Sequence, residues 1–208
     1  PAMSPGGPVH SCKEETTMQY KLTTPCTAED LVPLKAGDTV LLSGVVYTAR
    51  DQAHKRMLEA LDKGEKLPFD LEGSAIYYVG PTPERPGEII GSAGPTTSGR
   101  MDAMSPRLLD LGNKIMIGKG KRDAAVKEAV VRNGAVYLAA LGGAGALMAQ
   151  SVKTLEVIAW PDLGCEAVRR LTVEDMPLTV ILDAHGGDLY LSGPAAYKRQ
   201  QGEGAKEL

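Results

Sequence analysis

The alternation of short β-rich runs with segments of helical period constrains the fold of this chain more than any other feature. Residues 39–47 form a run rich in β-branched and aliphatic side chains, and the apolar residues of the next segment, 50–61, fall on one helical face. The same change of period recurs along the sequence. Strands that alternate with helices favour an α/β fold in which at least some strands pair in parallel. The pattern leaves the order of the strands open.

The other elements are placed by the same criteria. Further strands are predicted at residues 74–80, 89–90, 114–117, 135–139, 156–160, 168–173 and 178–182, and further helices at residues 101–111, 123–133 and an Ala-rich segment that ends at residue 150. Residues 1–17 are rich in Pro, Gly, Ser and charge and have no apolar period, so we expect a flexible leader there. Residues 18–190 are expected to form one domain, and residues 191–208 a polar C-terminal tail that frays.

Composition narrows the classes of partner. The net charge is −3, whereas a surface that binds duplex nucleic acid carries a basic excess, so no nucleic-acid partner is expected. The longest apolar stretch, residues 135–148, contains three glycines and is shorter than the roughly 20 residues of a membrane helix. The three cysteines, Cys12, Cys26 and Cys165, are odd in number and widely spaced, which argues against a disulfide framework and a local metal site. A reducing cytoplasm is therefore the expected location.

Three loops present cations after predicted strands. Arg50 stands where the helix of residues 50–61 begins, so that an anion there would be held by the guanidinium and by free backbone N–H groups. The alternative is a surface arginine paired with Asp51, and His54 on the apolar face is expected to be structural rather than catalytic. Residues 94–102, with sequence GPTTSGRMD, place three hydroxyl residues and an arginine in a compact cradle for a carboxylate or phosphate. The alternative there is a helix start that Ser98 caps.

The remaining motifs are less specific. Residues 117–122, with sequence IGKGKR, lack the spacing of a nucleotide-binding P-loop, so the lysine between two glycines is either a substrate-binding cation or part of a basic turn. Residues 141–146 depart from the dinucleotide pattern at Met148, which favours a tight strand-to-helix turn. Residues 162–166 and 174–177 supply either an acid pair or structural carboxylates. The residues alone therefore indicate an α/β domain with three cationic loops, and they leave open whether these loops converge on one anion.

Together these loops resemble the β subunit, or C-terminal domain, of class I fumarases and the related tartrate dehydratases. The resemblance rests on residues 50–55, 94–102, 118–120, 162–164, 174–177 and 183–190, and it covers roughly residues 22–190 in order. It implies a swivelling, three-layer β/β/α domain with a mixed sheet. The implied function is that of the β subunit of a hydro-lyase that interconverts (S)-malate and fumarate plus water.

The resemblance also implies a cofactor and a partner. Members of this family use a 4Fe-4S cluster that three cysteines of the α part hold, and its open iron acts as a Lewis acid on the substrate hydroxyl and one carboxylate. The cluster is therefore expected on a partner fumarase α subunit and not on this chain. A hetero-oligomer is expected in the cell, and the isolated chain is expected to be able to form a homo-oligomer.

The site residues follow from the same resemblance. Arg50, Arg100 and Lys119 are expected to bind the carboxylates of a small dicarboxylate substrate, and Thr96 is the catalytic candidate, as the proton acceptor. A threonine hydroxyl is a weak base, so this role requires a shifted pKa or a relay to a better base. The Gly-Lys-Gly pattern selects Lys119 over Lys121.

Two alternatives remain at this point. The same cations would serve the β subunit of a tartrate dehydratase, because tartrate and malate differ by one hydroxyl. A non-catalytic module that binds a dicarboxylate is the alternative from another class. Lys121 and Arg122 are expected to be solvated in each case.

Overall fold

A mixed sheet of seven strands forms the body of the protein in the computed structural model, which describes residues 18–140 and 145–204. The strands are β1 (Gln19–Thr24), β2 (Thr39–Thr48), β3 (Ala75–Tyr77), β4 (Ile115–Gly118), β5 (Val136–Ala140), β6 (Val152–Ala159) and β7 (Val168–Leu182). Strands β1 to β5 pair in parallel in sequence order, and β7 runs antiparallel to β2, β5 and β6. The expected α/β class with a mixed sheet is confirmed.

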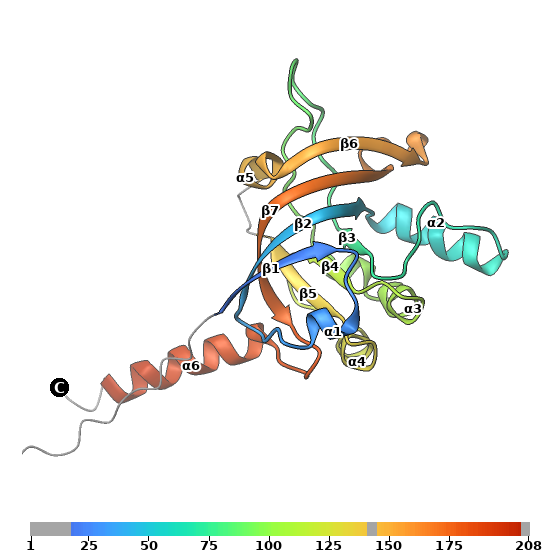
Figure 1. The fold of residues 1–208 in the computed structure, drawn as a ribbon. Coiled ribbons are helices and arrows are strands. Elements are labelled where there is room, and N and C mark those ends of the chain that lie inside the picture. The colour runs from blue at the N-terminus through green and yellow to red at the C-terminus, as the bar shows by residue number, and fades with distance from the viewer. Residues whose placement is uncertain (1–17, 141–144, 205–208) are drawn as a thin grey trace, which may run out of the picture.

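The long strand β7 closes part of this sheet into a ring (Figure 1). It pairs with β2 along most of its length, and residues 178–182 also pair with β5. Since β2, β3, β4 and β5 are successive neighbours, these four strands and β7 form a closed circuit, with β1 and β6 outside it. The two strands predicted at residues 168–173 and 178–182 are thus one strand.

Strand alternation creates two hydrophobic cores. In β3, Ala75 and Tyr77 belong to the core cluster inside the ring, whereas Ile76 belongs to a second cluster under the helices. Met57 of α2 and Val130 of α4 pack in that second cluster. Because side chains of a strand point to opposite faces in turn, strands buried on both faces read as the continuous apolar runs seen in the sequence.

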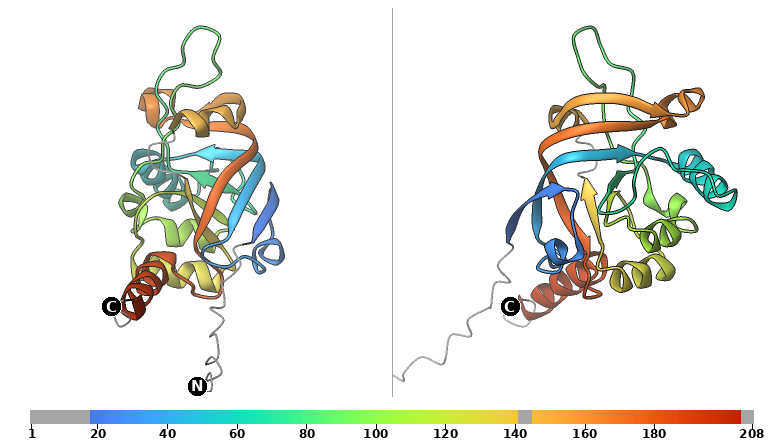
Figure 2. Two further views of the ribbon diagram at one scale, coloured as in Figure 1. Left: turned by 90° about the vertical axis from the view of Figure 1, so that its left-hand side faces the viewer. Right: turned by 45° about the vertical axis from the view of Figure 1, so that its right-hand side comes forward.

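Helices lie at several places around the ring. They are α1 (Ala28–Leu31), α2 (Asp51–Asp62), α3 (Ser105–Asp110), α4 (Ala124–Arg132), α5 (Gly145–Gln150) and α6 (Leu189–Gly204), with 3-10 helices η1 (Ser98–Met101) and η2 (Pro161–Glu166). In Figure 1, α2, α3 and α4 cover the same flank of the strands. The loop of residues 81–92 projects from one end of the molecule and α6 from the other (Figure 2). No helix of the described residues is long and apolar enough to cross a membrane.

Several predicted boundaries differ from the structure. The short strand predicted at residues 89–90 is wrong, because both residues lie in the projecting loop. The helix predicted at residues 101–111 is shorter and is preceded by η1. Helix α6 runs across the boundary expected at residue 190, and the leader expected at residues 1–17 lies outside the described residues.

Candidate functional site

The loops that carry the predicted site residues leave one edge of the sheet. Strands β2, β3, β4 and β5 are parallel neighbours, so their carboxyl ends meet at the same edge. Arg50 follows β2, Gly80 follows β3, and Lys119 follows β4. In α/β sheets, ligands bind in the crevice outside the carboxyl ends of parallel strands.

The loop of residues 94–99 crosses this edge and joins the ends of β3 and β4. The Thr96 backbone N–H donates to the Tyr78 carbonyl at 2.7 Å, just beyond β3. The Ser98 N–H donates to the Lys119 carbonyl at 2.9 Å, and Thr97 and Lys119 form an isolated β-bridge. Thr96 therefore lies between the ends of two neighbouring strands, and Arg100 follows in η1.

Ser98 anchors this loop from below. Its side chain is buried, its Oγ lies 2.9 Å from the Tyr137 hydroxyl, and the Lys119 N–H donates to it at 3.1 Å. Gly118 makes the approach possible, because a Cβ there would lie 2.0 Å from the Ser98 Oγ. The alternative in which Ser98 caps a helix is wrong, because η1 has Thr97 at its N-cap and no side-chain cap.

Arg50 already has acidic neighbours within the chain. Its Nη2 lies 3.3 Å from a Glu166 carboxylate oxygen and 3.6 Å from Asp51, and its side chain is 19% exposed. Glu166 also accepts from the Gln52 backbone N–H at 2.9 Å, in the first turn of α2. The place predicted for an external anion thus holds the carboxylate of Glu166. The arginine is paired with Asp51, as the alternative expected, but it is mostly buried.

Glycine at position 80 gives the Arg50 guanidinium its room. A Cβ at Gly80 would lie 2.8 Å from the Arg50 Nη1. The Arg50 Nε is buried and has no hydrogen-bond partner among the described residues. Arg50 is therefore packed against the loop that follows β3, in which Val79 forms an isolated β-bridge with Pro95, the residue before Thr96.

Arg100 and Lys119 are both exposed. Neither forms an ion pair with a carboxylate in the part of the chain that the structure describes. Both side chains are thus available to an external anion. The backbone of the structure brings together the loops of all four predicted site residues.

The next two basic residues, Lys121 and Arg122, differ from each other in exposure. Lys121 is exposed, as predicted. Arg122 is buried, with its Nε 2.6 Å from the Asp102 carboxylate, so the prediction of a solvated side chain is wrong. Local pattern could not reveal this, because the partner lies 20 residues earlier in the sequence.

His54 lies beneath the site and not in it. It is fully buried, its ring meets the Tyr78 ring edge-on at 5.2 Å, and its Nδ1 lies 3.0 Å from the Arg50 carbonyl. Burial lowers the pKa of His54 to about 4; the hydrogen bond to Arg50 opposes this shift, and the Arg122 charge adds to it. This neutral, buried ring is what the expected structural role requires.

The acidic residues that were considered as an acid pair are paired with bases instead. Arg56 Nη1 donates to Asp162 at 2.9 Å, and Glu174 lies 3.5 Å from Lys153. Asp175 lies 3.8 Å from Lys21. These contacts favour structural carboxylates.

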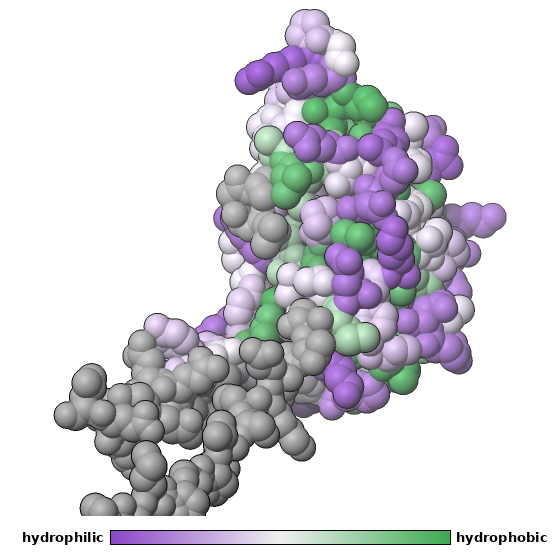
Figure 3. All heavy atoms as spheres, turned by 60° about the vertical axis from the view of Figure 1, so that its left-hand side comes forward, coloured by the Kyte–Doolittle hydropathy of each residue, from purple (hydrophilic) through white to green (hydrophobic). Residues whose placement is uncertain are grey.

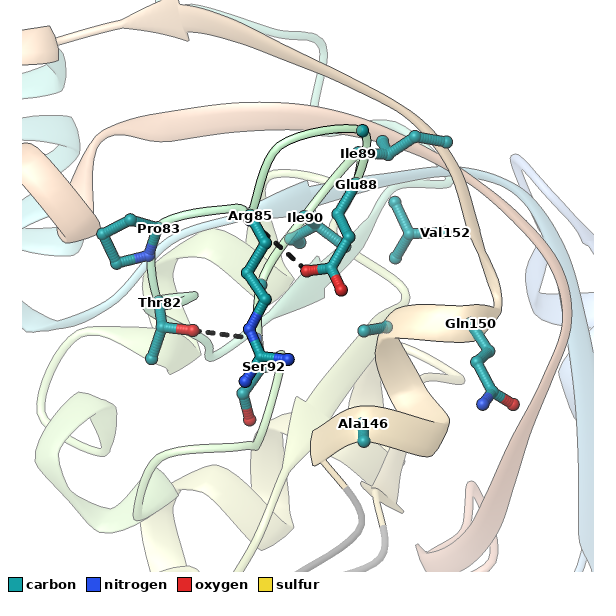
Figure 4. Close-up of a pocket in the computed structure, with 13 residues that line it drawn as sticks. Thr82, Pro83, Arg85, Glu88, Ile89, Ile90, Ser92, Ala146, Gln150 and Val152 are labelled. Carbon is teal, nitrogen blue, oxygen red and sulfur yellow. Dashed lines mark hydrogen bonds between the residues drawn. The ribbon is translucent and has the colours of Figure 1, made fainter.

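Two pockets flank the projecting loop. One has a volume of about 520 Å³ and lies between residues 82–92, α5 and the start of β6; Figure 4 shows Ile90 and Val152 on its apolar side. The other, of about 460 Å³, lies between residues 81–84, η2 and β6. None of the four predicted site residues lines either pocket. Figure 3 shows hydrophobic surface below the hydrophilic tip of this end of the molecule. These pockets are therefore separate from the cationic edge of the sheet.

The fold and the cationic edge together define an α/β domain whose polar loops gather at the carboxyl ends of its parallel strands. Residues 4–193 match the family model described as Fumarase C-terminus, and the chain therefore belongs to this family. The resemblance found in the sequence is confirmed.

Relatives of two kinds carry this domain. Fumarate hydratase 2 of Leishmania major is 37% identical over 188 residues, which cover 88% of this chain and 32% of that protein. The aerobic class I fumarate hydratase of Escherichia coli is 40% identical over 151 residues, which cover 72% of this chain and 28% of that protein. The putative L(+)-tartrate dehydratase subunit beta of Methanocaldococcus jannaschii is 42% identical over 170 residues, covering 79% and 87%. The chain spans about a third or less of the length of these fumarate hydratases.

Proposed function

We propose that this chain is the β subunit of an iron–sulfur hydro-lyase that interconverts (S)-malate and fumarate plus water. The observation that carries the proposal is the meeting of the loops of Arg50, Thr96, Arg100 and Lys119 at one edge of the sheet. Membership of the Fumarase C-terminus family and the names of the relatives support it. Both substrates are small dianions, which cations from separate loops are suited to hold.

The four residues would divide the work as follows. Arg100 and Lys119 are exposed, and each would bind one of the two substrate carboxylates directly. Arg50 would exchange part of its contact with Glu166 for one of the same two carboxylates. The backbone of Thr96 is held between the strand ends. Its hydroxyl would accept the proton from the substrate carbon and pass a proton on to a stronger base.

The described residues do not fit a 4Fe-4S cluster on this chain alone. They include two cysteines, and no group of three or more potential ligands is found among them. Burial, and to a lesser degree Asp30, raises the pKa of the Cys26 thiol to about 11, which disfavours the thiolate that a cluster requires. Cys165 is exposed, and Cys12 lies outside the described residues. We assign the cluster, which would supply Lewis-acid chemistry, to a partner α subunit.

The proposal includes an assembly and a finer description of the fold. Two relatives are named as subunits beta, and they match this chain over 87% of their own length. A hetero-oligomer with an α subunit is consistent with these names. We also propose a cytoplasmic location and, for the isolated chain, self-association. The ring with helices on one flank is consistent with a swivelling, three-layer β/β/α domain.

A tartrate dehydratase β subunit is the second candidate function. It is favoured by the same two subunits, whose extent matches that of this chain. The ratio of kcat/KM for (S)-malate to that for L(+)-tartrate in the assembled enzyme distinguishes the two. A ratio below one would replace the fumarase proposal by the tartrate one.

The test of the shared site uses the chain co-expressed with an α partner and reconstituted anaerobically. Arg50→Met, Arg100→Met and Lys119→Met should each lower kcat/KM by about 30-fold to several thousand-fold, which corresponds to about 2–5 kcal/mol of lost transition-state binding. Lys121→Met is the matched control. It should change the free energy of transition-state binding by less than about 1 kcal/mol, because that lysine is exposed. Thr96→Val should lower kcat more than it raises KM. If Lys121→Met lowered kcat/KM as much as Lys119→Met does, that result would contradict the assignment.

A further inference from the structure

A charged pair is buried directly behind the cationic edge. The side chain of Arg122 has no exposed surface, and that of Asp102 is 12% exposed. Removing a charge from water is costly, and buried ion pairs are often no more stabilising than apolar residues of the same size. Stability alone therefore gives no sufficient reason for an arginine at this position.

Each nitrogen of the Arg122 guanidinium has a hydrogen-bond partner. Its Nε donates to Asp102 at 2.6 Å, its Nη1 to the Met116 Sδ at 3.3 Å and its Nη2 to the Ser105 Oγ at 3.0 Å. The group also lies between two aromatic rings, 5.4 Å from the centroid of Tyr78 and 5.0 Å from that of Tyr137. Such cation–π contacts strengthen when they are removed from water.

These partners connect the two loops that present exposed cations. Asp102 follows Arg100 by two residues, and its second carboxylate oxygen accepts from the Asp123 N–H at 2.8 Å. The Tyr137 hydroxyl donates to the Gly120 carbonyl at 3.0 Å, one residue after Lys119.

The same hydroxyl closes the network onto the first loop. Tyr137 is hydrogen-bonded to Ser98, which in turn accepts from the Lys119 N–H. Both loops are thus fixed to one buried cluster, which we define as Ser98, Asp102, Arg122 and Tyr137. No member of the cluster is one of the four proposed site residues.

We propose that this buried cluster is a positioning device that sets the separation of Arg100 and Lys119, and that it thereby makes the site selective for a dicarboxylate over a monocarboxylate. The inference deepens the proposed function and rests on it. A dianion needs two cations at a fixed spacing, because both carboxylates must be bound at once. A monoanion needs only one of them, so a change in spacing leaves its affinity nearly unchanged.

The experiment measures competitive inhibition of the assembled enzyme by succinate and by propionate, two unreactive acids that differ by one carboxylate. Asp102→Leu/Arg122→Met removes both buried charges together and keeps the volume, so that no unpaired charge remains. Tyr137→Phe keeps the ring that faces Arg122 and removes only the hydroxyl. Each variant should raise the inhibition constant of succinate by about 10-fold and change that of propionate by less than about 2-fold.

The control is Arg132→Met, which removes an exposed ion pair between Arg132 at the end of α4 and Asp110 at the end of α3. It should leave both inhibition constants unchanged. Equal changes for the two acids, or none in Tyr137→Phe, would overturn the inference while leaving the proposed function intact. Wild-type enzyme with no preference for succinate would instead overturn the proposed function.

Discussion

Replacing Gly118 by alanine tests how tightly the site loop is packed onto the sheet. Gly118 is the last residue of β4 and is buried. The added Cβ would lie 2.0 Å from the Ser98 Oγ and 3.0 Å from a ring carbon of Tyr78. Both distances are below a normal contact, so Ser98 has to move away from its place in the buried cluster.

The expected loss of stability has two parts. Overpacking of a core by one methyl group costs about 1–3 kcal/mol. Displacing the Ser98 hydroxyl breaks its contacts with Tyr137 and with the Lys119 N–H, at about 1 kcal/mol each. The free energy of unfolding should therefore fall by about 3–5 kcal/mol, which lowers Tm by about 6–20 °C for a domain of this size.

Thermal and urea unfolding of the isolated chain measure this change. Gly99→Ala, in the loop of residues 94–99, is the matched control, because a Cβ at Gly99 would meet nothing closer than 3.8 Å. Ser98→Ala in the Gly118→Ala background removes the clashing oxygen, so the double variant should be less destabilised than the sum of the two single variants. Additive losses, or a Gly118→Ala variant as stable as Gly99→Ala, would refute this account.

Two further predictions concern titratable groups. The folded-state pKa of His54, about 4, lies below its ordinary value of 6.5, so the unfolded chain binds a proton first as the pH falls; the free energy of unfolding should decrease between about pH 6.5 and 4, by up to about 3 kcal/mol. Urea unfolding against pH should show a shallower dependence in His54→Gln, and an equally steep one would contradict the burial argument. Alkylation of the native protein at pH 8, followed by peptide mapping, should label the exposed Cys165 and leave Cys26 unmodified until the chain unfolds, because Cys26 is buried and the pKa of its thiol is raised to about 11. Rapid labelling of native Cys26 would show that this core opens readily.

The fold could be predicted from the sequence where local pattern decides it. The β-rich run of residues 39–47 is β2, and the amphipathic segment 123–133 contains α4. The ring could not be predicted, because its closure depends on β7, whose middle reads as a turn. Asp175 has a positive φ there, and Pro177 lies where β7 has β2 on one side but pairs with neither β6 nor β5 on the other. A proline is tolerated at such a position because its missing N–H has no partner to lose.

In the candidate site, too, local sequence pattern predicts some features, whereas others depend on residues that are distant in sequence. The alternation of strands and helices predicts parallel pairing, which brings the ends of β2 and β4 to one edge, but it left open the strand order that decides whether the loops of Arg50 and Lys119 meet. The Glu166 contact with Arg50 and the burial of Arg122 did not follow from it. Both depend on residues distant in sequence, which no local period connects.

The closure of the ring by its last strand has a consequence for synthesis. Until residues 168–182 leave the ribosome, β2 and β5 lack a neighbour that each has in the finished protein. Partners so far apart in sequence pair slowly, and unpaired strand edges can join other chains in the meantime. A nascent chain halted before Val168 would therefore expose two open edges next to its future site, whereas release of the 15 residues of β7 covers both at once. Premature termination in this segment should give aggregates rather than a partly active domain.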